Sequence, residues 1–140
     1  MKENLVKLAE EIATIAHKGQ FRRCGTVPYI VHPRDVASRV GQDVDAQVVA
    51  WLHDVLEDSD FTEVDLMDKG FSETQVNAIK LMTKDGVTPY DEYLEKVATC
   101  PIATKVKIAD MISNLADSPT KKQIEKYAKG LLRLSKELSF

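Results

Sequence analysis

The sequence predicts an all-α fold, an irregular multi-helix bundle arranged around a central buried helix. Apolar residues recur with helical spacing along most of the chain, and no segment alternates polar and apolar residues as a half-buried strand does. Residues 48–56 are apolar around almost the whole helical circumference, which predicts a helix enclosed by the rest of the protein. The length of 140 residues suits a single domain, residues 1–140, with one core.

Helix boundaries are expected from apolar stripes and from the positions of proline, glycine and capping residues. Leu5, Leu8, Ile12 and Ile15 mark the first stripe, and Ser72 with Gln75 forms a capping-box pattern. Prolines fit the first turns of several later helices. The expected helices cover residues 3–17, 32–40, 45–56, 62–69, 72–82, 89–97, 101–117 and 124–131, with an irregular loop at 19–28.

Composition and charge argue against several classes of protein. The net charge of −3 does not favour a nucleic-acid partner, and no apolar run approaches the ~20 residues of a membrane span. The first residues are amphipathic and acidic, unlike a signal peptide. Cys24 and Cys100 lack the spacing of a metal or redox motif. We expect a cytoplasmic protein with neither a membrane nor a nucleic-acid partner.

Charge is distributed unevenly along the chain. Residues 17–39 contain five basic residues and one acid, whereas residues 41–68 contain nine acids and no Lys or Arg. An anionic ligand that meets a cation-binding region would account for this arrangement. Two solvated faces of opposite charge are the alternative interpretation.

The apolar segment 48–56 leads into an unusual group of polar residues. His53 and Asp54 fall within the part expected to be buried, and an unpaired buried carboxylate is costly. No Lys or Arg lies near Asp54 in the sequence, so a divalent cation would supply the missing charge. On a continuous helix, Glu57 and Asp58 would follow one turn later and line the same cleft.

A second carboxylate is expected inside the core. Asp110 projects into the apolar arc of its helix, and Asn114 lies one turn further along the same edge. His32, held before a proline, can join Asp110, whereas His17 lies beside a loop and shows no partner pattern. Two neutral imidazoles and two aspartates would neutralise a divalent ion and leave positions for water. A lone buried histidine, by contrast, is usually just a hydrogen-bonded core residue.

The order H…HD…D in an all-α chain resembles the HD-domain metal-dependent phosphohydrolases. Three segments, AHKGQFRRCGTVPYIVHPRDVA (16–37), HDVLEDSD (53–60) and KIADMISNL (107–115), are similar to the hydrolase domain of RelA/SpoT-type alarmone enzymes. The similarity covers nearly the whole chain and implies an HD-domain bundle. Because the synthetase domain of the long members has no room here, we expect a small, hydrolase-only alarmone hydrolase.

The resemblance implies a role for each residue of the predicted site. A manganese ion would be held by His32, His53, Asp54 and Asp110. The attacking water and proton transfer would be handled by Glu57 and Asp58.

The resemblance also implies how a nucleotide is held. Arg22 would stack on the guanine base, and Arg23 and Lys18 would hold phosphate. A guanidinium plane suits both tasks, since it stacks on a purine and pairs with phosphate. Asn114 and Tyr127 match positions that contact the nucleotide.

The activity implied is manganese-dependent hydrolysis of the 3′-pyrophosphate of guanosine tetra- or pentaphosphate. Two alternatives stay open: a phosphohydrolase for another nucleotide, such as an adenine alarmone or a phosphorylated dinucleotide, and a non-catalytic nucleotide sensor. The chain departs from the family pattern at Met111 and Ala116, where basic residues are common, and at Cys24, where serine is common. The segment TKDGVTPYDEYLEKV is also short and acidic where some members bind phosphate.

Overall fold

A computed structural model describes residues 2–138, with side chains from residue 4 onward. Within this range the chain is helical and has no strand, apart from one isolated bridge between Phe21 and Pro28. This confirms the predicted all-α class. The helices are α1 (Lys2–Ala16), α2 (Val31–Ser38), α3 (Val44–Leu52), α4 (Val55–Asp58), α5 (Glu63–Asp68), α6 (Glu73–Met82), α7 (Tyr90–Ala98), α8 (Pro101–Leu115) and α9 (Lys121–Ser135).

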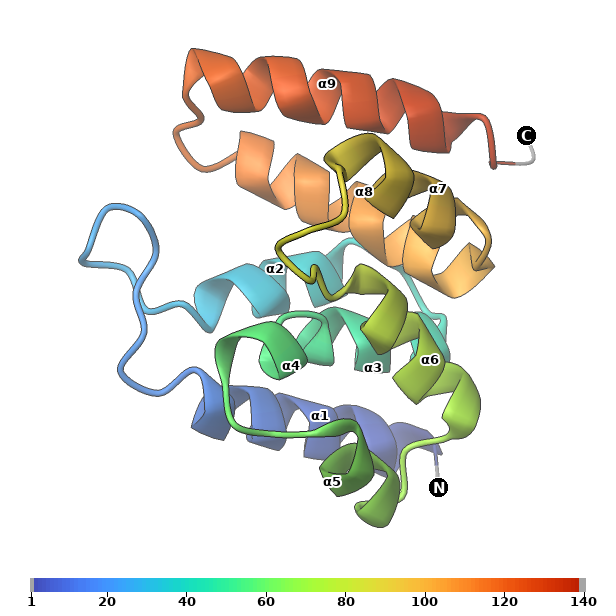
Figure 1. Cartoon of the computed structure of the whole chain (residues 1–140). Helices are drawn as coiled ribbons and strands as arrows, with labels where there is room; N and C mark the ends of the chain where they lie inside the picture. The colour runs from blue at the N-terminus through green and yellow to red at the C-terminus, as the bar shows by residue number, and fades with distance from the viewer. Residues whose placement is uncertain (1, 139–140) are drawn as a thin grey trace.

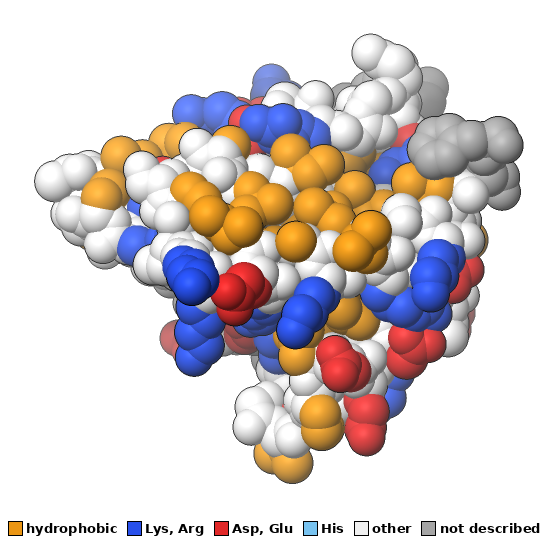
Figure 2. All heavy atoms as spheres, turned by 90° about the horizontal axis from the view of Figure 1, so that it is seen from above, with side chains coloured by type: hydrophobic (Ala, Val, Ile, Leu, Met, Phe, Trp, Pro, Cys, Tyr) orange, Lys and Arg blue, Asp and Glu red, His pale blue; other side chains and the backbone are white. Residues whose placement is uncertain are grey.

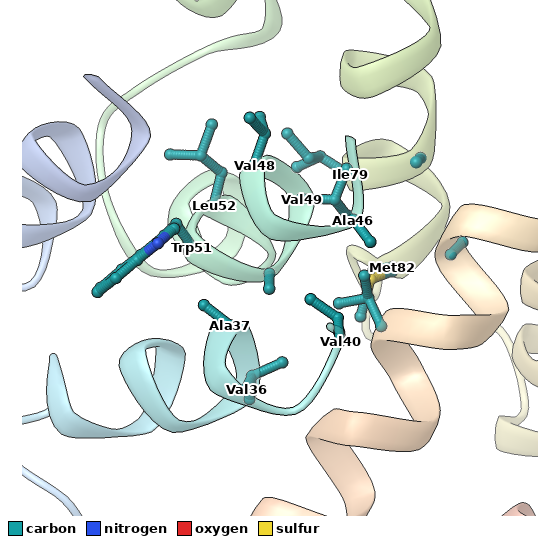
Figure 3. Packing of buried hydrophobic residues seen from close by; sticks show 14 of the residues in the cluster. Val36, Ala37, Val40, Ala46, Val48, Val49, Trp51, Leu52, Ile79 and Met82 are labelled. Carbon is teal, nitrogen blue, oxygen red and sulfur yellow. The ribbon is translucent and has the colours of Figure 1, made fainter. Parts of the chain in front are cut away.

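Helix α3 occupies the centre of the molecule, as predicted. It contacts α1, α2, α6 and α8, and Figure 1 shows α1 on one side of it and α8 and α9 on the other. Val48, Val49 and Leu52 have no exposed surface. Figure 3 shows the side chains of α3 beside Val40, which follows α2, and Ile79 of α6. Burial of these aliphatic side chains fixes the positions of α2 and α3. The site is built from the start of α2 and the end of α3.

The prediction of one continuous helix over residues 45–56 is wrong. The helix α3 stops at Leu52, a turn carries His53 and Asp54, and α4 begins at Val55. Nδ1 of His53 lies 2.7 Å from the carbonyl oxygen of Ala50. That oxygen would accept the backbone N–H of Asp54 in a continuous helix, so the imidazole competes with the helical hydrogen-bond pattern.

Capping residues set the start of the later helices. The predicted capping box of Ser72 and Gln75 is present at α6. An equivalent box, formed by Thr120 and Gln123, begins α9 and was not predicted. The left-handed turn at Ser118, with φ of 47°, separates α8 from α9.

The helices α8 and α9 pack closely and form one end of the molecule. A Cβ atom at Gly130 of α9 would lie 2.7 Å from Sδ of Met111 in α8, so glycine allows this approach. Figure 2 looks down on this end and shows hydrophobic side chains gathered on its surface. Ile124 and Leu132 of α9 are among the exposed hydrophobic residues. No helix in the described range is long and apolar enough to cross a membrane.

Candidate metal centre and active site

Two helices and one turn bring the predicted metal ligands together. His32 comes from α2, His53 and Asp54 from the turn after α3, and Asp110 from α8. One ligand atom from each of His32, His53 and Asp110 lies within 4.8 Å of the other two. All three residues are at least 95 % buried. Residues far apart in sequence therefore form one compact cluster of nitrogen and oxygen donors.

The orientation of His53 leaves a buried lone pair facing two carboxylates. The carbonyl oxygen of Ala50 can only accept, so Nδ1 of His53 carries the ring proton. Nε2 is buried, and although burial lowers the pKa of His53, the charges of Asp54 and Asp110 raise it by more, so this nitrogen binds a cation strongly, either a proton or a metal ion. It lies 3.0 Å from Oδ2 of Asp54 and 3.4 Å from Oδ1 of Asp110. Three acceptors converging on one point fit a bound cation, whose charge all three would share.

The other ligands are oriented by neighbouring side chains. Nε2 of His32 lies 2.7 Å from Oδ1 of Asp110, and its Nδ1 lies 3.1 Å from Oγ of Ser113. The hydroxyl of Tyr29 donates to Oδ2 of Asp54 at 2.5 Å. Burial and the charge of Asp54 raise the pKa of Tyr29, so its hydroxyl keeps the proton that it donates. Such contacts hold metal ligands in place.

One of the two buried carboxylates has a lysine partner that the sequence analysis did not identify. Nζ of Lys107, which is 4 % exposed, lies 2.8 Å from Oδ2 of Asp110. Burial lowers the pKa of Lys107, but the charge of Asp110 outweighs it, and the net shift is upward. The sequence held a signal for this pair, because Lys107 lies three residues before Asp110 on one helix.

The pairing with Lys107 changes the charge of the cluster. Asp54 and Asp110 carry two negative charges, and Lys107 compensates one of them. A divalent ion would therefore make the cluster net positive rather than neutral. A net positive centre at the base of a cavity suits an anionic ligand such as a phosphate.

The cluster lies at one wall of a cavity of about 340 Å³. Several predicted catalytic and substrate-binding residues line the same cavity: Arg22, Arg23, Glu57, Asp58, Asn114 and Tyr127. They come from the 19–28 loop, α4, α8 and α9. The space is within the usual range for a small-molecule site.

Glu57 and Asp58 reach the cavity from α4. Oε1 of Glu57 accepts a hydrogen bond from the backbone N–H of Lys84 at 2.8 Å. The backbone carbonyl of Asp58 accepts from Nε2 of Gln20 at 2.8 Å. Burial and the nearby carboxylates of Asp54 and Glu57 raise the pKa of Asp58 to about 6. One acid of the pair can thus exchange a proton near neutral pH.

The basic loop contributes its arginines but not its lysine. Nε of Arg22 donates to Oδ2 of Asp117 at 2.8 Å, and Nη2 donates to Oδ1 of Asn114 at 3.2 Å. Nη2 of Arg23 donates to the backbone carbonyl of Asp117 at 2.6 Å. These contacts use the edge of the Arg22 guanidinium and fix its plane. Lys18 is exposed and does not line the cavity.

His17 is more than the loop-side residue expected from the sequence. It is 2 % exposed, and its Nδ1 lies 2.8 Å from Oε1 of Gln20. Its ring packs 4.8 Å from the ring of Tyr29, measured between centroids. Burial lowers the pKa of His17. His17 therefore supports the tyrosine that contacts Asp54. Its partner, three residues further on, was the signal that the sequence analysis missed.

Comparisons with known proteins point to one group of enzymes. A Haemophilus influenzae guanosine-3′,5′-bis(diphosphate) 3′-pyrophosphohydrolase is 49 % identical over 61 residues, covering 41 % of this chain and 9 % of that protein. The Aquifex aeolicus enzyme of the same name is 31 % identical over 121 residues, covering 79 % and 17 %. A probable GTP pyrophosphokinase of Mycobacterium leprae is 31 % identical over 143 residues, covering 88 % and 17 %. The chain thus spans less than a fifth of each of these relatives, and no family model matches it.

The fold has a counterpart among solved structures. A metazoan ortholog of SpoT, described as hydrolysing ppGpp, matches with a TM-score of 0.77 at 24 % identity. The match covers 93 % of this chain and 84 % of that structure. Sequence similarity and fold together identify the chain as an HD domain of the RelA/SpoT type.

Proposed function

We propose that the chain is a manganese-dependent hydrolase acting on the 3′-pyrophosphate of guanosine tetra- or pentaphosphate. The products are GDP or GTP and pyrophosphate. One observation carries the proposal: the buried Nε2 of His53 faces the carboxylates of Asp54 and Asp110 at the wall of a cavity that arginines also line. Relatives named as 3′-pyrophosphohydrolases support the choice of substrate.

The donor set fits a divalent metal ion. His32, His53, Asp54 and Asp110 would hold it, and imidazole with carboxylate is a donor set that manganese accepts. The ion would supply Lewis acidity, polarising a phosphoryl oxygen and acidifying water. Lys107 would keep Asp110 ionised and oriented, since its ammonium group donates to the second oxygen of that carboxylate.

Glu57 and Asp58 would manage the protons of the reaction. In the hydrolysis, the oxygen of water bonds to phosphorus, and the bond from phosphorus to the 3′ oxygen breaks. Glu57, held by the backbone of Lys84, takes the proton from water. Asp58, with its pKa raised to about 6, returns a proton to the departing 3′ oxygen.

The nucleotide would lie between the 19–28 loop and α9. The guanidinium of Arg22 presents its plane to the base, because its edge is occupied by Asp117 and Asn114. Tyr127 offers an aromatic ring in the same cavity, and Arg23 adds positive charge for phosphate. We assign Lys18 no contact with the substrate, because it lies outside the cavity wall.

We further propose that residues 1–140 act as one catalytic domain in the cytoplasm, where nucleotide substrates occur. The non-catalytic alternative has less support, because a pure sensor has no need of two carboxylates beside the metal cluster. A phosphohydrolase for another nucleotide would use the same metal centre and would differ in its contacts with the nucleotide base. Product analysis separates these alternatives.

The test is to incubate metal-free protein with guanosine tetraphosphate, with and without Mn²⁺, and to separate the products. We expect GDP and pyrophosphate in equal amounts, only with the ion. Glu57→Gln, which keeps every proposed ligand, is the matched control and should bind the ion without fast turnover. Release of orthophosphate alone would assign the chain to a different phosphohydrolase activity.

A further inference from the structure

The polar groups around the proposed base position are mostly engaged with one another. Oδ1 of Asn114 accepts from Arg22, and its Nδ2 donates to Oδ1 of Asp110 at 3.3 Å. The edge of Arg22 is paired with Asp117 and Asn114. Arg23 donates to the carbonyl of Asp117. These side chains shape the cavity, but their hydrogen-bonding edges face each other rather than a base.

Gln123 differs from these residues because one end of its amide is fixed and the other is free. It lies in the first turn of α9 and also lines the cavity. Its Oε1 accepts from the backbone N–H of Thr120 at 2.9 Å, and only the oxygen of the amide can do so. Its Nε2 has no hydrogen-bond partner among the described residues. The helix cap therefore holds Gln123 as a pure donor at the cavity wall.

Tyr127 lies one turn beyond Gln123 on α9, and both residues line the cavity. The cavity thus brings together an aromatic ring and an amide donor from α9 with the loop that carries Arg22. A base that stacks in this cavity presents its polar edge to the wall, where the amide of Gln123 is a free donor.

We infer that Gln123 determines the base preference of the site by donating a hydrogen bond from Nε2 to the 6-oxo group of guanine. The inference rests on the proposed function. Both purines present an acceptor at N7, but at position 6 guanine presents an acceptor and adenine an amino donor. Because the helix cap fixes the amide, Gln123 cannot turn its oxygen toward the base. The amino group of adenine would therefore face another donor and form no hydrogen bond with it. The site is therefore selective for 6-oxopurine nucleotides.

Gln123→Glu is the sharpest test, because it changes only the free end of the side chain. Glutamate serves equally well in a capping box, so α9 keeps its N-terminal cap. The free amino group becomes an oxygen that accepts from adenine and repels O6. We expect the ratio of kcat/KM for the guanine and adenine 3′-pyrophosphorylated nucleotides to fall by about 10- to 100-fold. The added negative charge weakens the binding of both nucleotides alike, so the ratio of their kcat/KM values is the quantity to compare.

Gln123→Met provides the matched control. Methionine has a similar length but neither a donor nor an acceptor. The ratio of kcat/KM for the guanine and adenine nucleotides should therefore approach one, and adenine should not become the preferred base. Thermal melting of all three proteins separates a change in specificity from a loss of the cap. An unchanged ratio in Gln123→Glu with full turnover of the guanine substrate would overturn the inference and leave the proposed function standing.

Calorimetric titration with GDP and ADP tests the inference without turnover. The wild-type protein should bind GDP about 10-fold or more tightly than ADP, and Gln123→Glu should lose this preference. If guanosine tetraphosphate is not hydrolysed but the GDP preference depends on Gln123, the proposed function fails while the base assignment holds. Equal affinity of the wild-type protein for GDP and ADP would contradict the base assignment itself.

Discussion

The hydroxyl of Tyr29 donates a 2.5 Å hydrogen bond to Oδ2 of Asp54, and this joins the 19–28 loop region to the metal cluster. The ring of Tyr29 lies 4.8 Å from the ring of His17 and 5.7 Å from the ring of His32, measured between centroids. The tyrosine thus packs against two imidazoles. Asp54 is the cluster carboxylate that lacks a lysine partner, so its orientation depends on this contact.

Tyr29→Phe should weaken metal binding without unfolding the protein. Loss of the hydroxyl frees Asp54 to rotate, and contacts of this kind are worth about 10- to 100-fold in metal affinity. Titration of Mn²⁺ into metal-free protein measures the effect. Tyr93→Phe is the control, because it removes a buried tyrosine hydroxyl that donates to the carbonyl of Met82 instead. Equal losses of Mn²⁺ affinity in both variants would mean that Tyr29 has only a packing role.

Arg22→Ala should raise KM on the order of 10-fold and change kcat little. Base stacking contributes about 1–3 kcal/mol and is similar in the ground and transition states. Steady-state kinetics with guanosine tetraphosphate measures both constants. Lys18→Ala is the control, because this exposed lysine lies outside the cavity wall. Comparable KM values for the two variants would remove Arg22 from the binding site.

Lys107→Met should destabilise the protein by about 3 kcal/mol, because it leaves the buried carboxylate of Asp110 without its cation. Urea unfolding of metal-free protein measures the change. Lys105→Met removes an exposed lysine paired with Asp43 and should cost less than about 1 kcal/mol. Adding Asp110→Asn to Lys107→Met should cost little more, since the pair is already broken. Additive effects would show that the two side chains act independently.

Asp58→Asn should stabilise the metal-free protein at pH 7.5 but not at pH 4. The folded-state pKa of Asp58 is raised to about 6 from its ordinary value near 3.8. The stability contributed by its protonated form is therefore present below about pH 4 and is lost as the pH rises through 6. Because the side chain is partly exposed, the gain at pH 7.5 should be about 1 kcal/mol.

Thermal melting at the two pH values tests this prediction. Asp60→Asn, an exposed substitution two residues further on, serves as the control. If Asp58→Asn raised the melting temperature equally at pH 4 and pH 7.5, the surroundings of Asp58 would not disfavour its ionised form.

Much of the site was predictable from local patterns. His53, Asp54 and Asp110 stand within apolar segments of the sequence, and that contrast marks them without any knowledge of the fold. One predicted capping box and the prolines at 33, 89 and 101 likewise placed the starts of α6, α2, α7 and α8 to within one residue. The helix break at His53 was not predictable in this way, because it depends on the imidazole reaching back to the carbonyl of Ala50.

Apart from Lys107 and His17, whose partners lie three residues away, the residues that the sequence analysis missed depend on contacts between distant segments. Asp117 fixes Arg22 across 95 residues of sequence, and Tyr29 reaches Asp54 across 25. Gln123 is set by a local cap but is brought to the cavity by the packing of α9 on α8. The periodicity of apolar residues shows which face of a helix is buried, but it does not show which residues of other segments contact that face.

The central claim is that the cluster of His32, His53, Asp54 and Asp110 binds one divalent ion. Calorimetric titration of Mn²⁺ into metal-free wild-type protein and into His53→Ala tests it most directly. We expect one ion per wild-type chain and loss of binding in His53→Ala, with Glu57→Gln binding like the wild type. Affinity should fall as the pH drops and the imidazoles protonate. Equal binding by the wild type and His53→Ala, or no binding by the wild type, would contradict the account.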